Sequence, residues 1–319
     1  MALTVAEFQT LAQSVRAEIG KLVRGQDALI NLLLVAIFAR GHCLLEGPPG
    51  TAKTLLAQCL SRVTTLQFGR VQFTPDLMPS DVLGVNMFNF QTSEFRLTKG
   101  PVFTDILLAD EINRAPPKTQ AALLQAMNER EVTIDGVSHP LGPDFFVVAT
   151  QNPIEQHGTY PLPEAQLDRF LFKLIVAFPD RAAEIAILQQ GGNGGSTQRQ
   201  LQALQPVLSA EALQAAHELV DAIRLDDTII TYIVDLVRAT RSDTEVLHGA
   251  STRAAAALAG AVRAQAALEG RDYGLPDDVQ RLFVPALRHR IILGPTAEID
   301  GRDASDVLQT ILNRQDAPR

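Results

Sequence analysis

The strongest constraint on this chain is a glycine-rich loop, Gly47-Pro48-Pro49-Gly50-Thr51-Ala52-Lys53-Thr54, set between a short apolar strand pattern and a helical pattern. A phosphate-binding loop requires this context, because backbone N–H groups and the positive end of the helix then face the phosphates. Lys53 is expected to reach the β- and γ-phosphates, and the Thr54 hydroxyl to coordinate Mg²⁺. Ala52 stands where such loops usually have their last glycine. We expect an ordinary φ at this helix start, where one methyl group is tolerated.

A second signature lies further along the chain, where the apolar run Ile106–Ala109 ends in Asp110 and Glu111. Polar groups at the end of a buried strand lie where α/β sheets bind their ligands. Asp110 is expected to hold Mg²⁺ through its hydration shell, and Glu111 to polarise an attacking water molecule. Each signature alone has a plain alternative, either a glycine–proline turn or two acids that cap the next helix. Together they indicate a site that hydrolyses a nucleotide.

Three more polar residues are candidates for this site. Asn152 follows a strand pattern, where its amide would align the water or contact the γ-phosphate, although Asn before Pro is equally common in turns. Arg169 begins an apolar strand. It either forms a salt bridge with Asp168 or another acid, or it acts as an arginine finger for the γ-phosphate of a neighbouring subunit. Arg253 lies in a first helical turn, where it opposes the helix dipole. An anionic partner would explain Arg253, and a solvated side chain is the alternative.

The composition is that of a globular protein, with 319 residues of which 46% are hydrophobic and 20% charged. A net charge of -8 argues against a broad nucleic-acid surface, which usually has a basic balance. The longest apolar stretch, Ala28–Ala39, is far shorter than the roughly 20 residues that span a bilayer. We therefore expect no transmembrane segment, and the absence of a signal pattern makes the cytoplasm the expected location.

Short apolar runs alternate with helical patterns in the first part of the chain. Strands are expected near 43–46, 69–73, 105–109, 145–150 and 171–176, and helices near 53–62 and 117–129. Such alternation is typical of a mostly parallel sheet covered by helices on both faces. The sequence therefore predicts an α/β domain over residues 1–178.

Two segments interrupt the alternation. Residues 82–98 are expected to form an insert, and residues 131–140 a hairpin, because Asp135-Gly136 between alternating residues is a strong hairpin signal. After the α/β region the patterns become helical, which predicts an all-helical second domain over 179–319. Its helices are expected near 181–190, 209–223, 228–241, 252–269, 276–289 and 304–313. The glycine-rich stretch 191–196 is expected to be a surface loop between helices.

Four stretches together resemble the MoxR family of AAA+ ATPases over essentially the whole chain. They are Glu46 to Thr54, Asp110 to Lys118, Ala149 to Phe170 (including the runs Ala149-Thr150-Gln151-Asn152-Pro153 and Leu167-Asp168-Arg169-Phe170), and Gly249 to Arg253. The resemblance implies an AAA+ P-loop core, with a mostly parallel sheet flanked by helices, followed by a C-terminal helical lid. One departure is Thr252, where the lid motif often has proline.

The resemblance also implies roles for the candidate residues. Lys53 and Thr54 match the Walker A lysine and its Mg²⁺-binding hydroxyl, and Asp110 and Glu111 match the Walker B pair. The remaining matches are sensor 1 at Asn152, the arginine finger at Arg169, the sensor 2 arginine at Arg253 and an adenine cradle at Gly25 and Gln26. ATP and Mg²⁺ are the implied cofactors. We expect ATP to lie between the α/β domain and the lid, with Arg169 supplied by a neighbour.

The resemblance further implies an ATPase that converts ATP and water to ADP and phosphate in a homo-oligomer, usually a hexameric ring. Such a chaperone-like motor remodels or activates other proteins, often with a partner that carries a von Willebrand factor A domain. One alternative is a magnesium-chelatase-like or nucleic-acid-translocating AAA+ motor. Another is a nucleotide-gated protein-binding module without turnover.

Overall fold

The computed structural model describes residues 3–153, 158–189 and 194–318, and its centre is a five-stranded sheet. The strand order is β2-β5-β8-β1-β9, and all neighbouring strands are parallel. The strands are β1 (His42–Glu46), β2 (Phe68–Gln72), β5 (Ile106–Asp110), β8 (Phe146–Gln151) and β9 (Phe170–Ile175). The predicted parallel α/β sheet is therefore confirmed.

Helices cover both faces of this sheet, because apolar side chains alternate between two cores along each buried strand. Leu108 and Val148 belong to one core, while Leu107 and Val147 belong to the other. The first core is covered by α1 (Val5–Gly20), α2 (Asp27–Phe38) and α3 (Lys53–Val63), and the second by α5 (Pro117–Glu129). The carboxyl ends of the strands are the part of such a sheet where α/β folds bind their ligands.

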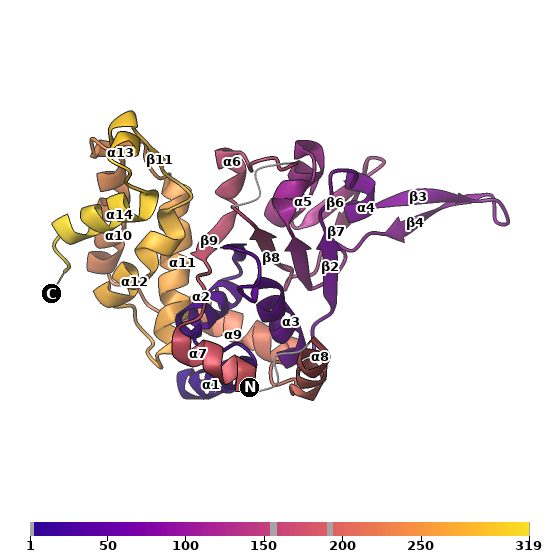
Figure 1. The fold of residues 1–319 in the computed structure, drawn as a ribbon, viewed down its shortest axis with the longest axis horizontal. Helices are drawn as coiled ribbons and strands as arrows, with labels where there is room; N and C mark the ends of the chain where they lie inside the picture. The colour runs from indigo at the N-terminus through magenta and orange to yellow at the C-terminus, as the bar shows by residue number, and fades with distance from the viewer. Residues whose placement is uncertain (1–2, 154–157, 190–193, 319) are drawn as a thin grey trace.

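The C-terminal part of the chain forms a helical lid beside the sheet (Figure 1). Its main helices are α9 (Ala210–Ala222), α10 (Asp227–Ser242), α11 (Thr252–Leu268), α12 (Pro276–Leu287), α13 (Pro295–Ile299) and α14 (Ala304–Arg314). A short antiparallel pair, β10 (Val246–His248) and β11 (Ile292–Leu293), was not expected. Helix α11 packs against α1, α2 and α9, so the lid shares the first core. Within the described ranges, none of the helices combines the length and apolar character that crossing a bilayer requires.

Two shorter helices, α7 (Arg181–Gln189) and α8 (Gly194–Ala203), link the sheet to the lid. Residues 191–193 of the expected glycine-rich loop lie outside the described residues. The expectation was wrong for residues 194–196, since Gly194 already begins α8. Glycine and serine are among the residue types preferred at the N-terminal end of a helix.

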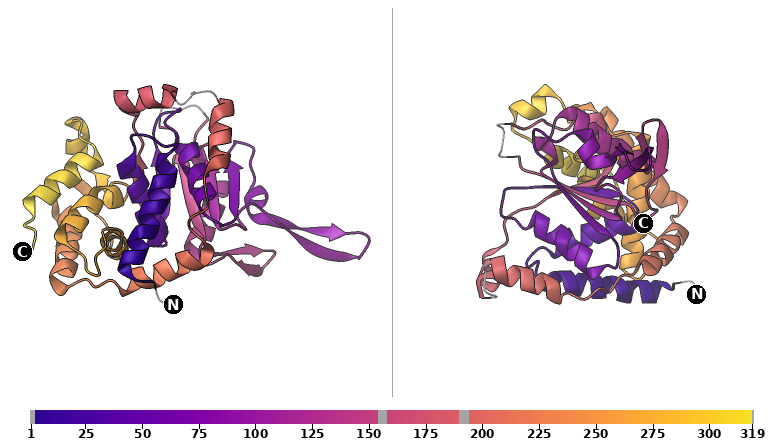
Figure 2. Two further views of the ribbon diagram at one scale, coloured as in Figure 1. Left: turned by 90° about the horizontal axis from the view of Figure 1, so that it is seen from below. Right: turned by 90° about the vertical axis from the view of Figure 1, so that its right-hand side faces the viewer.

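The two interrupting segments each form an antiparallel hairpin. Strands β3 (Gly84–Asn89) and β4 (Glu94–Lys99) form the first, and β6 (Glu131–Ile134) and β7 (Val137–Pro140) the second. Asp135 and Gly136 have φ values of 50° and 80°, the positive φ pair of a type I′ turn. Figures 1 and 2 show that the β3–β4 hairpin projects away from the body, on the side opposite the lid.

Candidate nucleotide site and arginine pocket

A cavity of about 650 Å³ lies at the carboxyl ends of β1, β5 and β8. The predicted site residues that line it are Gln26, Pro49, Gly50, Thr51, Ala52, Lys53, Thr54, Asp110, Glu111 and Asn152. Gly47 and Pro48 form the start of the loop, and Gly25 lines an adjoining cavity. The parallel sheet thus brings together segments that are distant in sequence, as α/β folds do at their ligand sites.

Hydrogen bonds within the phosphate loop hold it curved around Lys53. The Lys53 ammonium donates to the Gly47 and Pro48 carbonyl oxygens at 2.6 and 2.8 Å, and the Thr51 hydroxyl donates to the Pro48 carbonyl oxygen at 2.8 Å. Gly47 is needed because a Cβ there would lie 2.2 Å from the carbonyl oxygen of Val176, the residue that follows β9. Partial burial lowers the pKa of Lys53, although the negative charges of Asp110 and Glu111 oppose that shift.

The expected ordinary backbone at Ala52 was wrong. Its φ and ψ are 64° and 19°, in the left-handed region. Gly50 also has a positive φ, of 82°, so two residues of the loop have a positive φ before α3 begins at Lys53. The left-handed conformation costs an L-residue roughly 1–2 kcal/mol, which the surrounding loop must offset. The loop therefore tolerates the Ala52 methyl group even though the backbone there is left-handed.

The Asp110 carboxylate is the most extensively bonded acid of the cavity. It is 6% exposed and accepts hydrogen bonds from the Thr150 hydroxyl at 2.7 Å and from the Arg70 guanidinium at 2.8 Å. The Thr54 hydroxyl lies 3.3 Å from one of its oxygens. A hydroxyl oxygen and a carboxylate so close together are the kind of oxygen ligands that Mg²⁺ prefers.

Glu111 has a left-handed φ of 56°, and its carboxylate has different partners from that of Asp110. The Gln72 amide donates to this carboxylate at 2.8 Å, and Arg114 forms an ion pair with it at 3.1 Å. The Glu111 N–H donates to the Thr150 hydroxyl at 2.9 Å. The two adjacent acids therefore make different contacts at the cavity.

The sequence analysis missed several residues of this cavity, among them the polar side chains of Arg70, Gln72 and Thr150. Gln72 lies in register with Asp110 across the β2–β5 pair, and Arg70 lies two residues earlier on the same strand. A strand that ends in polar residues, next to a strand that ends in acids, is a sequence pattern that could have indicated these cavity residues. It becomes specific only once β2 is known to be the neighbour of β5.

Asn152 lies just beyond the end of β8, is 6% exposed, and lines both this cavity and a smaller one beside it. On the opposite wall, the Gln26 amide donates to the Thr51 carbonyl oxygen at 3.4 Å. Gly25 has a φ of 70°, and a Cβ there would lie 2.7 Å from the Ala183 Cβ in α7. The segment before α2 therefore closes the cavity from the side of α7.

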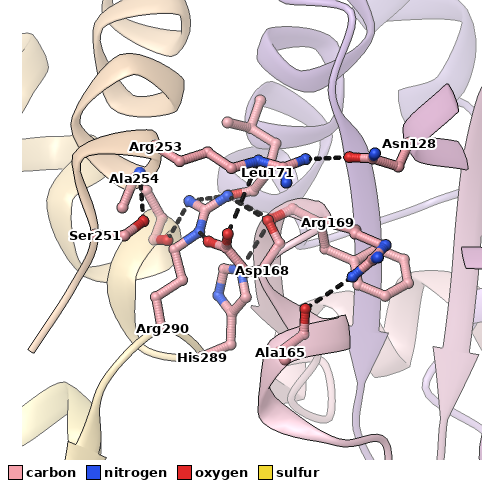
Figure 3. A network of polar contacts seen from close by, with 12 residues as sticks. Asn128, Ala165, Asp168, Arg169, Leu171, Ser251, Arg253, Ala254, His289 and Arg290 are labelled. Carbon is pink, nitrogen blue, oxygen red and sulfur yellow. Dashed lines mark hydrogen bonds and ion pairs between the residues drawn. The ribbon is translucent and has the colours of Figure 1, made fainter. Parts of the chain in front are cut away.

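Arg169 and Arg253 line a separate cavity of about 290 Å³ that shares no lining residue with the first among the described residues. Five arginines and one acid contribute to it: Arg40, Arg130, Arg169, Arg253, Arg290 and Asp168. The Arg169 guanidinium donates to the Ala165 carbonyl oxygen at 2.8 Å, and Arg253 donates to the Asn128 amide oxygen at 2.6 Å (Figure 3). Arg169 forms no ion pair with any described acid, so the expected alternative of a salt bridge to Asp168 is not observed.

This arginine pocket lies at the amino ends of β1 and β9, where Gly41, His42 and Leu171 line it. The phosphate loop follows the carboxyl end of β1, so a five-residue strand separates the two cavities, or roughly 16 Å at 3.3 Å per residue. The expectation that the lid's Arg253 faces the nucleotide of its own subunit was therefore wrong. Helix α11 packs against α1, α2 and α9, and this contact carries its N-terminal end to the far end of the sheet.

Together, the sheet, the phosphate loop and the lid define an AAA-type ATPase domain. A family model described as "ATPase family associated with various cellular activities (AAA)" matches residues 42–172, and an AAA lid domain model matches residues 238–311. The chain is 40% identical to "Chaperone MoxR1" of Mycobacterium tuberculosis, over 98% of this chain and 84% of that protein. The chain belongs to the MoxR family of AAA+ ATPases.

Two further proteins are similar along nearly their whole length. "Uncharacterized protein YeaC" of Bacillus subtilis is 44% identical over 94% of this chain and 92% of its own. The crystal structure of "a putative ATPase from Cytophaga hutchinsonii" superposes with a TM-score of 0.89 at 39% identity, covering 99% of this chain and 97% of that one. Both likenesses include the lid as well as the α/β core.

Proposed function

We propose that this protein is an ATP-driven, chaperone-like motor that hydrolyses ATP to ADP and phosphate and remodels or activates partner proteins. The phosphate loop and Lys53 bind the phosphates, while Thr54 and Asp110 hold Mg²⁺. When bound, Mg²⁺ neutralises charge on the β- and γ-phosphate oxygens. Glu111 orients and polarises the attacking water molecule, and Asn152 contacts the γ-phosphate from the end of β8.

The observation that carries this proposal is the arginine pocket at the opposite end of the sheet. Five arginines and one acid create a cationic cavity suited to a strongly anionic ligand. Arg169 and Arg253 are too far from their own phosphate loop to contact its nucleotide, and they are suited to a nucleotide held by a neighbouring subunit. A homo-oligomer, for which we propose the hexameric ring common in the family, would complete every nucleotide site in this way.

The action on proteins rests on the relative named as a chaperone and on the exposed apolar side chains of the β3–β4 hairpin. Phe90 is 88% exposed and Phe95 is 72% exposed near the hairpin's turn. Large exposed aromatic side chains are typical of surfaces that contact other proteins. A partner with a von Willebrand factor A domain and a cytoplasmic location are further parts of this proposal, and the net charge of -8 disfavours nucleic acid as a client.

A Glu111→Gln variant tests the assignment directly. It should bind ATP with unchanged affinity and lose nearly all phosphate release, because the amide cannot accept a proton from water. Undiminished turnover would refute the site. The same variant, immobilised with ATP, should retain client and partner proteins for identification by mass spectrometry, with Lys53→Ala as the control that lacks bound nucleotide.

Subunit mixing tests the contribution of the neighbour. Arg169→Ala should lower turnover by about 10³-fold or more, the usual magnitude for an arginine finger. Adding Lys53→Ala subunits, which lack a functional phosphate loop and keep Arg169, should restore part of the activity. An absence of recovery at every mixing ratio would contradict the role proposed for Arg169 in the neighbour's site.

A further inference from the structure

Arg290, just beyond the end of α12, joins the lid to the segment that carries Arg169 (Figure 3). Its side chain is only 3% exposed, and its Nε donates to Asp168 Oδ1 at 2.8 Å. Its Nη2 donates to the carbonyl oxygens of Phe170 at 2.8 Å and Asp168 at 3.2 Å. Its Nη1 donates to the Ala286 carbonyl oxygen of its own helix at 2.8 Å. One guanidinium therefore binds the backbone on both sides of Arg169.

His289 adds a second bond from the lid to the same segment. Its Nε2 lies 2.9 Å from the Phe170 carbonyl oxygen, to which it donates. Burial is the main cause that lowers the pKa of His289 well below its usual value, so the imidazole is neutral and a carbonyl is a suitable partner. Two consecutive lid residues thus hold the peptide that follows Arg169.

Asp168 also connects this segment to the second arginine of the pocket. Its Oδ2 lies 3.8 Å from Arg253 Nε, whereas its Oδ1 is 2.8 Å from Arg290 Nε. The Arg253 side chain is 55% exposed, so its pairing with Asp168 is long and screened by solvent. Arg290 is the fixed partner of this carboxylate, and Arg253 remains available to an entering anion.

We propose that Arg290 and His289 are positioning residues. They hold Arg169 of the α/β core and Arg253 of the lid at the spacing that lets both contact one phosphate group. The inference rests on the proposed function, because it assigns the two arginines to the nucleotide of a neighbouring subunit. Arg169 and Arg253 come from different domains, and their spacing depends on how the lid is fastened to the core. The hydrogen bonds of Arg290 and His289 attach the lid to the core at the arginine pocket.

Arg290→Lys is the sharpest test, because it keeps the buried charge while a single ammonium cannot reproduce the branched contacts of the guanidinium. We expect ATP affinity to stay within about twofold and turnover to fall about 10²-fold, the effect of a misplacement of roughly 1 Å at a reacting centre. Arg288→Lys, two residues earlier, is the matched control, because among the described residues the hydrogen bond of the Arg288 guanidinium goes to the Val284 carbonyl oxygen of α12 and not to the segment that carries Arg169. Arg288→Lys should leave turnover unchanged.

Substitutions at His289 provide a second, independent test. The Gln side chain of His289→Gln retains an N–H that can donate to the Phe170 carbonyl oxygen, and it should keep most of the turnover. His289→Leu removes that donor and should lose turnover about tenfold, with ATP affinity again unchanged. Equal effects of the two substitutions would contradict the positioning role.

Mixing separates the inference from the function on which it rests. Arg290→Lys subunits should recover turnover when mixed with Lys53→Ala subunits, since their phosphate loops are intact. Recovery with Arg169→Ala but not with Arg290→Lys would overturn the inference and leave the proposed function standing. Failure of the Arg169→Ala mixture would overturn both. Unchanged turnover of Arg290→Lys, or loss of its ATP binding together with a lower Tm, would likewise reject a positioning role.

Discussion

His42 is expected to make this protein sensitive to acid, since its imidazole is enclosed at the start of β1. Its Nδ1 accepts a hydrogen bond from the Val147 N–H at 3.1 Å, and its Nε2 donates to the Met127 carbonyl oxygen at 3.2 Å. This pair of partners suits only the neutral ring with its proton on Nε2. Burial, the largest cause, lowers the pKa of His42 from 6.5 to about 4.

The direction of this shift sets its effect on stability. Because the folded-state pKa is below the unfolded one, the contribution of His42 is fully present above pH 6.5 and is lost as the pH falls toward 4. The unfolded chain takes up the proton first. With pKa values of 6.5 and about 4, linkage makes the folded state about 2.5 kcal/mol less stable at pH 4.5 than at pH 7.5.

Denaturant unfolding of the native protein and of His42→Gln at both pH values measures this effect. The variant should be about 1–2 kcal/mol less stable at pH 7.5, because the Val147 N–H is left without its partner. Its loss of stability on acidification should be about 2.5 kcal/mol smaller than that of the native protein. His248→Gln, at an exposed position, is the control. Equal pH dependence in the native protein and His42→Gln would refute the reasoning.

The backbone of the phosphate loop supports two further predictions. Ala52→Gly should raise the free energy of unfolding by about 0.5 kcal/mol, because relief of the left-handed strain exceeds the added entropy of the unfolded chain. A lower free energy of unfolding in denaturant would contradict the claim that Ala52 is strained. Gly47→Ala should lower that free energy by about 2 kcal/mol or more and weaken ATP binding, since the new Cβ would lie 2.2 Å from the Val176 carbonyl oxygen. Native-like unfolding and nucleotide affinity in Gly47→Ala would show that the loop can move aside.

Local pattern was sufficient to predict many of the residues that line the cavity at the carboxyl ends of β1, β5 and β8. A phosphate loop is contiguous in sequence, and Asp110 follows its own strand directly. Parallel strands then bring such strand ends to one edge of the sheet without further information. The conformation of Ala52 was predicted wrongly, because residue type alone does not encode a φ of 64° when the packing of the whole loop imposes it. Thr150 and Arg70 were missed since the strand order decides which side chains meet Asp110.

The sequence by itself therefore determined the class of protein, the helical lid and the residues available for nucleotide chemistry. Only the tertiary structure decided where Arg253 lies and what holds Arg169. Arg290 is 122 residues from Asp168 along the chain, and no local periodicity links them. Their contact follows from the packing of α11 and α12 on the α/β core, which carries the lid's arginines to the end of the sheet opposite the phosphate loop. Long-range packing thus converts one subunit's pocket into half of a site that a neighbour is proposed to complete.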